Sequence, residues 1–218
     1  MKNSDQKNRY FPVYIDLHQK PCLVVGGGSV AQRKTESLLS AGAEIRIIAP
    51  QVTSELKMLN QSKKIQWIPG TYDTSYVDRV TLVIAATSDP NVNQKVYDDC
   101  ADRNILVNVV DEPQRCSFIV PAVLNRGDIQ VSVSTGGAAP TLAGQIRDKI
   151  AEVITEEKVV LVRALKQLRP RIRRLPREYR SEFWDYIKRI EIDGYKNNPS
   201  QILYDVEQKV AHYEKGML

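Results

Sequence analysis

A run of three glycines, directly after a short apolar segment, constrains the fold of this chain more than any other feature. Gly26, Gly28 and Ala31 fit the pattern G-x-G-x-x-[G/A]. The first glycine permits a tight turn, the second lets a pyrophosphate approach the backbone, and the small third residue lets a helix pack against a strand. The apolar run 21–25 precedes the glycines and a helical pattern, 29–41, follows them. The sequence therefore predicts a dinucleotide-binding unit whose helix N–H groups face the phosphates.

The alternation of strand-like and helical segments continues beyond the glycines. Strands are expected at 44–49, 65–68, 80–86 and 105–110, and helices at 52–60 and 91–103. Strands that alternate with helices form a mostly parallel sheet with helices on both faces. The sequence thus predicts an α/β fold, with a Rossmann-type first domain over residues 1–113.

The pattern changes after Pro113. Two β-like segments, 117–121 and 129–134, lie on either side of the turn sequence 125–128. There is no room for a crossover helix between them, which predicts an antiparallel pair.

From Thr141 onward the apolar residues have helical spacing. We expect four residues to divide the end of the chain into short helices: Pro170, Pro176, Gly194 and Pro199. The predicted organisation is therefore a Rossmann domain at 1–113, a small β-containing segment at 114–145 and a helical C-terminal domain at 146–218.

The composition is that of a globular protein. Hydrophobic residues make up 42% of the 218 residues and charged residues 26%, which argues against disorder. No apolar run approaches the roughly 20 residues of a membrane helix, and the polar segment 1–9 lacks the apolar stretch of a secretory signal. We therefore expect a cytoplasmic protein with a frayed polar leader and no membrane partner.

Neither disulfides nor a metal site is expected. Cys22, Cys100 and Cys116 are far apart, and His18 and His212 are the two histidines of the sequence. An odd number of widely spaced cysteines does not indicate a disulfide framework, and two histidines supply few ligands for zinc. The cysteines are expected to be small buried apolar residues.

Positive charge is concentrated in one part of the chain. The formal net charge is +5, and residues 163–180 contain eight basic residues against one acid, Glu178. Such a run favours an anionic partner, for example nucleic acid, an acidic membrane surface or a polycarboxylate small molecule. A solvated helix face explains the same charges equally well.

Two polar residues follow later strands at the edge where doubly wound sheets bind ligands. Thr87 ends the strand 80–86, and Asp111 ends the strand 105–110. Asp111 is a candidate general base. The alternative is that Asp111 caps the turn that precedes Pro113.

The end of the second strand lacks the acidic residue that usually binds the adenine ribose. Ala49, Pro50 and Gln51 stand there, about 20 residues beyond the glycines. Ribose recognition then depends on backbone groups or on Gln51, so these residues do not discriminate NAD from NADP. Arg46 lies within the strand and is no clear ligand for a 2′-phosphate.

A second loop of small residues leads into the helix expected at Thr141. It has the sequence Ser134-Thr135-Gly136-Gly137-Ala138-Ala139-Pro140. Such a loop is either an anion site at a helix N-terminus or a turn that permits close packing, and residue chemistry alone favours the turn.

Several motifs together resemble the precorrin-2 dehydrogenases, which are also found as the N-terminal part of siroheme synthase. In chain order they are F-P-V-Y at 11–14, L-V-V-G-G-G-S-V-A-Q-R-K at 23–34, A-A-T-S-D-P-N-V-N at 85–93, N-V-V-D at 108–111, C-S-F-I-V-P-A at 116–122 and S-T-G-G-A-A-P-T-L-A at 134–143. Their order and spacing match from Phe11 to Arg147, and the combination is far more specific than the glycine motif. The tail beyond Arg147 resembles the family only in being helical and basic.

The resemblance implies oxidation of precorrin-2 to sirohydrochlorin, with NAD as hydride acceptor, on the route to siroheme. By position, Ser29 and Val30 would meet the pyrophosphate. Pro50 and Gln51 would lie by the adenosine, and Thr87 would line the cofactor cleft.

The same resemblance assigns the substrate side of the site. Asp111 matches the proposed catalytic aspartate of the family, and the loop with Ser134, Thr135 and Gly136 would lie beside the tetrapyrrole. The segment 114–145 would supply the contacts of an intertwined homodimer. A tetrapyrrole with many carboxylates would also give the basic run a function, since arginine pairs carboxylates in two-point contacts.

Two alternatives to a dedicated NAD-dependent dehydrogenase stay open. The first is a bifunctional enzyme that also inserts iron as a sirohydrochlorin ferrochelatase, with Asp111 serving both reactions. The second is a non-enzymatic, nucleotide-responsive binding protein that uses its basic tail, with Tyr179, Phe183 and Trp184, on nucleic acid. The chain contains no recognised nucleic-acid module, so we expect a small-molecule substrate and no nucleic-acid partner.

Overall fold

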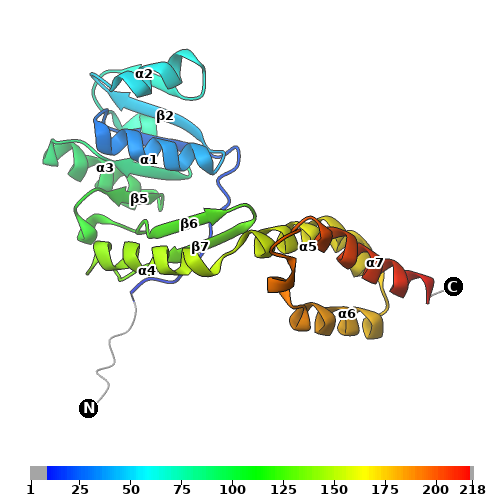
Figure 1. Ribbon diagram of the computed structural model, residues 1–218. Helices are drawn as coiled ribbons and strands as arrows, with labels where there is room; N and C mark the ends of the chain where they lie inside the picture. Colours follow the sequence, from blue (N-terminus) through cyan, green and yellow to red (C-terminus); the bar gives the residue numbers. More distant parts are fainter. Residues whose placement is uncertain (1–8, 217–218) are drawn as a thin grey trace. The chain divides into compact units, whose positions relative to one another are not determined.

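The chain folds as two compact units, seen in the computed structural model that describes residues 9–216 (Figure 1). The first unit extends to Val120, and the second begins at Pro121. The polar leader predicted at 1–9 lies, apart from Arg9, outside the described residues. The domain boundaries expected after residues 113 and 145 remain predictions.

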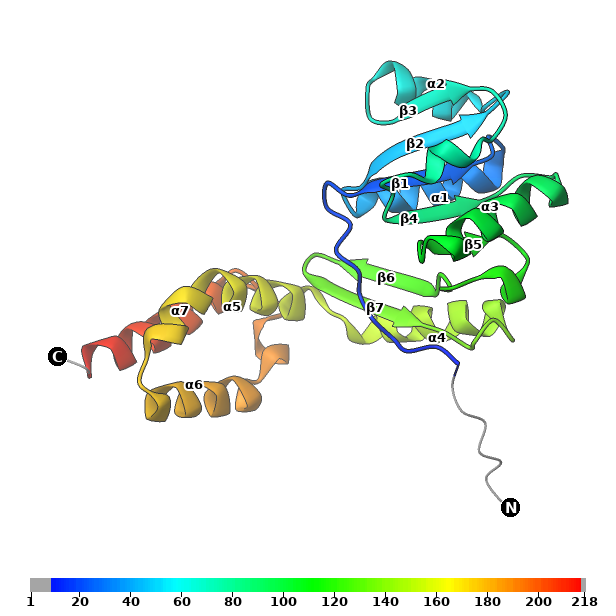
Figure 2. The same cartoon turned by 180° about the vertical axis from the view of Figure 1, so that it is seen from behind.

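A five-stranded parallel sheet forms the centre of the first unit. Its strands are β1 (Pro21–Val25), β2 (Glu44–Ala49), β3 (Gln66–Pro69), β4 (Leu82–Ala85) and β5 (Leu106–Val109), and their order is β3-β2-β1-β4-β5 (Figure 2). Val25 at the end of β1 is level with Ile48 on one side and Ala85 on the other. Because all strands run the same way, their carboxyl ends share one edge, and the ligand crevice of such sheets forms where the strand order reverses, beside β1.

Helices cover both faces of this sheet. They are α1 (Ser29–Ser40), α2 (Ser54–Gln61) and α3 (Pro90–Asp102). Ala31 and Leu56 bring α1 and α2 into the same core as Val24, whereas Val96 of α3 shares the opposite core with Val25. Successive residues of a strand point to opposite faces, so β1 contributes to both cores. The expected Rossmann-type α/β fold is confirmed.

One predicted strand is wrong. The first strand of the antiparallel pair is β6 (Ala122–Arg126), not residues 117–121. Ser117 is instead bonded to β5, because its N–H donates to the Val107 carbonyl (2.9 Å) and the Val107 N–H donates to the Ser117 hydroxyl oxygen (2.8 Å). These residues attach the chain to the edge of the parallel sheet before the hairpin begins.

The predicted antiparallel pair itself is confirmed, and it opens the second unit. β6 pairs with β7 (Ile129–Val133), and α4 (Pro140–Val153) packs against both strands. The turn between the strands is shorter than predicted and contains only Gly127 and Asp128. Gly127 has a φ of +58°, and a side chain there would meet Cγ1 of Val159 at 2.7 Å, so this turn requires glycine.

Three further helices complete the second unit: α5 (Glu156–Arg174), α6 (Arg177–Arg189) and α7 (Gln201–Lys215). α5 and α7 lie side by side (Figure 1), with Leu168, Ile172, Val206 and Val210 in their common core. The prediction that Pro170 divides the helices is wrong, because it lies within α5. Pro170 is exposed, and burial of Leu168 and Ile172 maintains the helix although proline removes one backbone donor. Within residues 9–216 no helix is long and apolar enough to cross a membrane.

Candidate dinucleotide and substrate site

The glycine turn lies at the carboxyl edge of the sheet, between β1 and α1. Gly26 has a φ of +123°, and its N–H donates to the Ile48 carbonyl (2.9 Å). A Cβ atom on Gly26 would lie 2.3 Å from the Ala86 carbonyl oxygen. Glycine is therefore needed here both for the backbone conformation and for the close approach of the chain that leaves β4.

Gly27, which the motif treats as a variable position, is the most crowded of the three glycines. A Cβ atom there would lie 1.9 Å from the Gln51 carbonyl oxygen and 2.9 Å from Cγ1 of Val52. The Gly27 carbonyl also accepts a hydrogen bond from the Thr53 N–H (3.1 Å). The motif did not identify this residue, although a third consecutive glycine was a signal for it. Gly27 lets the chain that follows β2 pack directly on the glycine turn.

Gly28 has open space where a side chain would project. No atom lies within 4 Å of an ideal Cβ, and its φ of −82° is accessible to any residue. Gly28 is also the N-cap of α1, and the first bond of that helix runs from the Gln32 N–H to the Gly28 carbonyl (3.0 Å). The N–H groups of Ser29 and Val30 precede that bond and are available to an anion. This cradle fits the pyrophosphate of a dinucleotide.

Pro50 and Gln51 follow β2 at the same edge, and both are exposed. The loop presents neither a carboxylate nor a cation to a ribose. Arg46 is occupied within the sheet, because its Nη2 donates to the Tyr76 carbonyl (3.3 Å). This arrangement agrees with the interpretation that Arg46 is not a 2′-phosphate ligand.

Thr87 follows β4 and has a structural role in the loop before α3. Its hydroxyl lies 3.0 Å from Oδ1 of Asn93 and 3.0 Å from the Asp89 carbonyl oxygen, and its carbonyl accepts from Nδ2 of Asn93 (3.2 Å). Asp89 in turn accepts hydrogen bonds from the first N–H groups of α3 as its N-cap. The Thr87 hydroxyl is therefore engaged in positioning this loop at the edge of the sheet.

Asp111 lies just beyond β5, at the same carboxyl edge as the glycine turn. The preceding N–H, of Val110, donates to the Ala85 carbonyl (2.9 Å), which fixes the chain to β4. Asp111 is exposed and has a φ of +63°, a conformation in which aspartate and asparagine are enriched among residues with side chains. Within the described residues its carboxylate makes no hydrogen bond or ion pair. Glu112, not Asp111, is the N-cap of the turn at Pro113–Arg115, so the capping alternative is not supported.

The residues that follow Asp111 are held by a buried cysteine. The Cys116 thiol lies 3.2 Å from the Val109 carbonyl oxygen, and Nδ2 of Asn108 donates to the Phe118 carbonyl (3.0 Å). Burial raises the pKa of the Cys116 thiol, which therefore stays protonated and unreactive at neutral pH. The prediction that the cysteines are small buried residues is confirmed, since Cys22, Cys100 and Cys116 are all free and buried.

The second loop of small residues belongs to the second unit, where it joins β7 to α4. The Ser134 hydroxyl accepts from the Gly136 N–H (3.0 Å), and the Thr135 hydroxyl accepts from the Ala139 N–H (3.0 Å). Gly136 has a φ of +65°. Both hydroxyls thus stabilise a tight turn, whereas the residues of the glycine turn and Asp111 belong to the first unit.

Comparison with known families identifies the first unit. A family model described as putative NAD(P)-binding matches residues 13–122, half of the chain. The chain belongs to this family. A second model, for the central part of a sirohaem biosynthesis protein, matches residues 126–152, which include Ser134, Thr135 and Gly136.

Relatives of this family member include long siroheme synthases. That of Photobacterium profundum is 38% identical over 180 residues, which are 82% of this chain and 38% of that protein. That of Actinobacillus succinogenes is 46% identical over 147 residues, 67% of this chain and 31% of that protein. This chain therefore spans less than half the length of these relatives.

A solved structure extends the similarity beyond the NAD(P)-binding part. SirC, a precorrin-2 dehydrogenase, matches with a TM-score of 0.74 and 25% identity, over 91% of this chain and 100% of that one. The predicted resemblance is confirmed: this member of the NAD(P)-binding family is a precorrin-2 dehydrogenase-like protein.

In this family member the basic run is partly structural. Arg171 of α5 donates through Nε and Nη2 to Glu214 (3.0 and 2.8 Å) and through Nη1 to Glu207 (2.8 Å), both on α7. Such a forked contact fixes the two helices against each other. Arg171 is therefore not available to a substrate.

Arg171→Met is expected to lower the melting temperature of the second unit by about 3–5 °C at pH 7, because a half-exposed ion pair contributes modestly. The hydrogen bond from Arg171 lowers the pKa of Glu214 below its ordinary value of 4.5. The stabilisation is therefore present above that value and is lost as the pH falls through the lowered pKa. Thermal unfolding followed by circular dichroism should show the difference from wild type shrinking in acid. Arg169→Met, an exposed neighbour, is the control, and equal effects of both variants would contradict this role.

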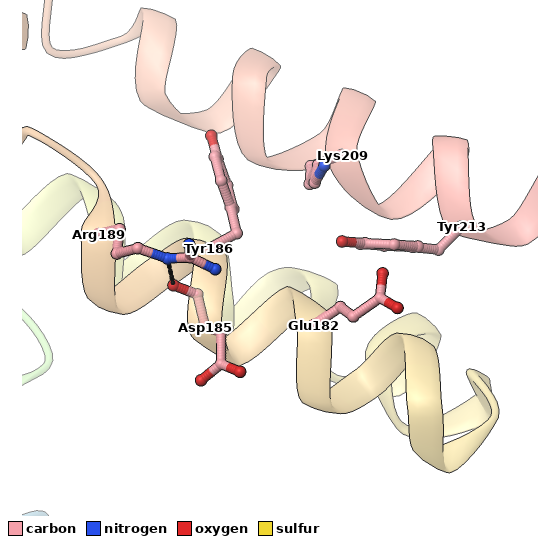
Figure 3. A pocket seen from close by; sticks show the side chains of 6 residues that line it. All are labelled: Glu182, Asp185, Tyr186, Arg189, Lys209 and Tyr213. Carbon is pink, nitrogen blue, oxygen red and sulfur yellow. Dashed lines mark hydrogen bonds between the residues drawn. The ribbon is translucent and has the colours of Figure 1, made fainter.

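A hollow of about 530 Å³ lies between α6 and α7 of the second unit. Figure 3 shows its lining: Glu182, Asp185, Tyr186, Arg189, Lys209 and Tyr213. The Lys209 ammonium lies 5.4 and 5.0 Å from the ring centroids of Tyr186 and Tyr213, and Nε of Arg189 donates to the Asp185 carbonyl (3.0 Å). Two carboxylates offset the two cations, so the hollow is poorly suited to a polyanion. Of these contacts, the one between Lys209 and Tyr186 joins α7 to α6.

Proposed function

We propose that this chain oxidises precorrin-2 to sirohydrochlorin, with NAD as hydride acceptor, in siroheme biosynthesis. The relatives named siroheme synthase and the solved precorrin-2 dehydrogenase support this reaction. The match to an NAD(P)-binding family supports a nicotinamide cofactor. NAD in preference to NADP is assigned on the family resemblance, because Ala49, Pro50 and Gln51 after β2 offer neither an acid nor a cation to the ribose.

The observation that carries the proposal is that a phosphate cradle and a free carboxylate share one edge of one sheet. The open space at Gly28 and the N–H groups of Ser29 and Val30 would hold the pyrophosphate. When bound, NAD supplies the hydride acceptor. Asp111, whose carboxylate makes no hydrogen bond or ion pair within the described residues, takes the proton that the macrocycle loses together with the hydride.

The substrate-binding residues are proposed from the second unit. Ser134, Thr135 and Gly136 form the turn between β7 and α4 and are assigned to the tetrapyrrole on the family resemblance. The α5 face opposite its buried residues carries exposed cations, namely Arg163, Lys166, Arg169, Arg173 and Arg174. The arginines among them suit the carboxylates of a tetrapyrrole, whereas Lys166 is paired with Asp128 and Arg171 with Glu207 and Glu214.

We further propose that the protein is a cytoplasmic homodimer, joined through α4. One face of this helix packs on the hairpin, and the other exposes Leu142, Ile146 and Val153, with fractional exposures of 48%, 40% and 58%. These residues and Ile150 line an open hollow of about 790 Å³. An apolar stripe of this kind on a folded chain marks an interaction surface, and a second copy of α4 is its occupant in this proposal.

Ile146→Glu is expected to weaken the dimer at least about a hundredfold, because a carboxylate would be buried at the centre of the apolar stripe. Sedimentation velocity across a concentration series measures this change. Met58→Glu, an exposed apolar residue of α2 in the first unit, is the matched control and should leave the dimer intact. A wild-type protein that stays monomeric at all concentrations would reject the dimer.

The proposed reaction is tested by an anaerobic absorbance assay. Purified protein is mixed with enzymatically prepared precorrin-2 and either NAD or NADP, and sirohydrochlorin and reduced cofactor are followed without added metal. Product that forms with NAD and in step with the reduced cofactor supports the proposal. Folded protein that binds NAD but gives no turnover with either cofactor would reject it and favour a nucleotide-responsive binding protein.

A further inference from the structure

Lys34 lies at the border of the buried face of α1. Ala31, Thr35 and Leu38 of this helix have fractional exposures of 0%, 0% and 7% and pack toward the sheet. At 100° per residue, Lys34 lies between this buried stripe and the exposed side of the helix, and it is half-buried. It is the one ionisable residue of α1 at such a border position, since Arg33 and Glu36 are exposed.

The geometry of α1 directs this side chain toward the candidate catalytic edge. α1 begins at the carboxyl edge of the sheet, and long side chains of a helix lean toward its N-terminus. Val110 and Phe118, on either side of Asp111 in the chain, pack against the same core as Ala31 and Leu38. The segment that carries Asp111 therefore lies along the face of the sheet that α1 covers.

The groups around the Lys34 ammonium agree with this direction. They are Arg33 on its own helix, and Asp111 and Cys116 from the segment after β5. Burial, and next the repulsion from Arg33, lower the pKa of Lys34 below its ordinary value, whereas Asp111 and Cys116 act in the opposite sense. Cys116 is a neutral thiol at neutral pH because burial raises its pKa, so Asp111 is the anion that acts on the pKa of Lys34.

The Lys34 ammonium has no direct partner in the part of the chain that the structure describes. Neither a hydrogen bond nor an ion pair within 4.0 Å is formed by its Nζ atom. Withdrawing a cation from water without a partner costs free energy, and such a group in a site is a candidate for ligand binding. Its position supports an anionic ligand beside Asp111.

We propose that Lys34 binds a carboxylate of the tetrapyrrole next to Asp111 and so determines which macrocycles the site accepts, a proposal that rests on the function proposed above. Precorrin-2 carries many carboxylates, and a charge-assisted hydrogen bond to one of them gives the ammonium its missing partner. The cofactor phosphates are a poorer match. In the proposed site the first-turn N–H groups of α1 would already serve them, and Lys34 is in the second turn, at the border of the helix face that shares a core with Val110 and Phe118.

The lowered pKa of Lys34 predicts how the affinity for the tetrapyrrole depends on pH. Carboxylate binding requires the protonated ammonium, so tetrapyrrole affinity is full near neutral pH and falls as the pH rises through the lowered pKa of Lys34. Lys34→Arg keeps a cation that stays protonated throughout. Lys34→Arg should therefore keep its affinity for the tetrapyrrole at alkaline pH, where the affinity of wild type falls.

The test compares Lys34→Met, Lys34→Arg and the control Lys64→Met, an exposed lysine just before β3 at the opposite edge of the sheet. Sirohydrochlorin is titrated by absorbance between pH 7 and about pH 10, and NAD is titrated separately. Lys34→Met should weaken sirohydrochlorin binding about ten- to a hundredfold at pH 7. It should raise KM far more than it lowers kcat and leave NAD affinity unchanged. Lys64→Met should match wild type.

Three results would overturn the proposal. In the first, Lys34→Met binds sirohydrochlorin as tightly as wild type. In the second, Lys34→Met loses affinity for NAD and not for sirohydrochlorin. In the third, the sirohydrochlorin affinity of Lys34→Arg falls at alkaline pH as much as that of wild type. The proposed reaction fails separately. Wild type that binds sirohydrochlorin through Lys34 but never oxidises precorrin-2 would remove the dehydrogenase function and keep the binding role.

Discussion

Asp111→Asn is expected to lower kcat for precorrin-2 oxidation by about a hundred- to ten-thousandfold, the usual contribution of a general base. Asparagine has nearly the same shape but cannot accept the proton. It also tolerates the positive φ of +63° at this position, so the variant should fold, whereas alanine would add backbone strain. Anaerobic single-turnover kinetics measure the rate, and a separate NAD titration should give wild-type affinity.

Asp102→Asn is the matched control for this experiment. Asp102 is an exposed acid at the end of α3 and thus at the opposite edge of the sheet, so turnover should not change. If Asp111→Asn oxidised precorrin-2 at nearly the wild-type rate, Asp111 would not be the base, and the proton would have to leave through another group or through water.

Gly27→Ala and Gly28→Ala are expected to impair different properties, stability and cofactor binding, although the residues are adjacent. A methyl group on Gly27 would lie 1.9 Å from the Gln51 carbonyl oxygen, a backbone atom that moves only with its loop. Overpacking of this kind costs at least about 2 kcal/mol, which corresponds to a fall of roughly 5 °C in the melting temperature of the first unit. A methyl group on Gly28 meets no protein atom, so stability should not change.

Gly28→Ala should instead lower the affinity for the cofactor. The methyl group would occupy the space through which a pyrophosphate approaches the backbone, and NAD affinity should fall about tenfold or more. Differential scanning calorimetry without cofactor and isothermal titration with NAD separate the two effects. Gly28→Ala that bound NAD normally would show that the pyrophosphate does not lie over this residue.

The fold of the first unit could be predicted because its signals are local. The apolar run of β1, the glycine turn and the helical pattern of α1 are contiguous, and the parallel order follows from repeated alternation. The error at residues 117–121 has a different origin. Those residues look β-like, but Ser117 bonds to Val107 of β5, and such an interaction between distant parts of the chain is not visible in a local pattern.

The same distinction applies to the candidate site. Gly26, Gly28 and Asp111 could be selected because a motif or a strand end marks them. Gly27 could not, since its constraint comes from Gln51, more than 20 positions later. Pro170 is a case in which a local signal misled the prediction. Proline tends to break helices, but burial of its neighbours Leu168 and Ile172 outweighs that tendency, and the helix continues.

The contact between Gly27 and Gln51 has a consequence for the evolution and engineering of cofactor choice. It is made by a backbone carbonyl, while the side chains of Pro50 and Gln51 point to solvent. Selectivity at the ribose can therefore be altered by exchanging the Gln51 side chain without rebuilding the phosphate turn. In the proposed site, the residues beside the ribose would thus be free to vary, whereas the turn that would hold the phosphates of either cofactor is fixed by steric contact.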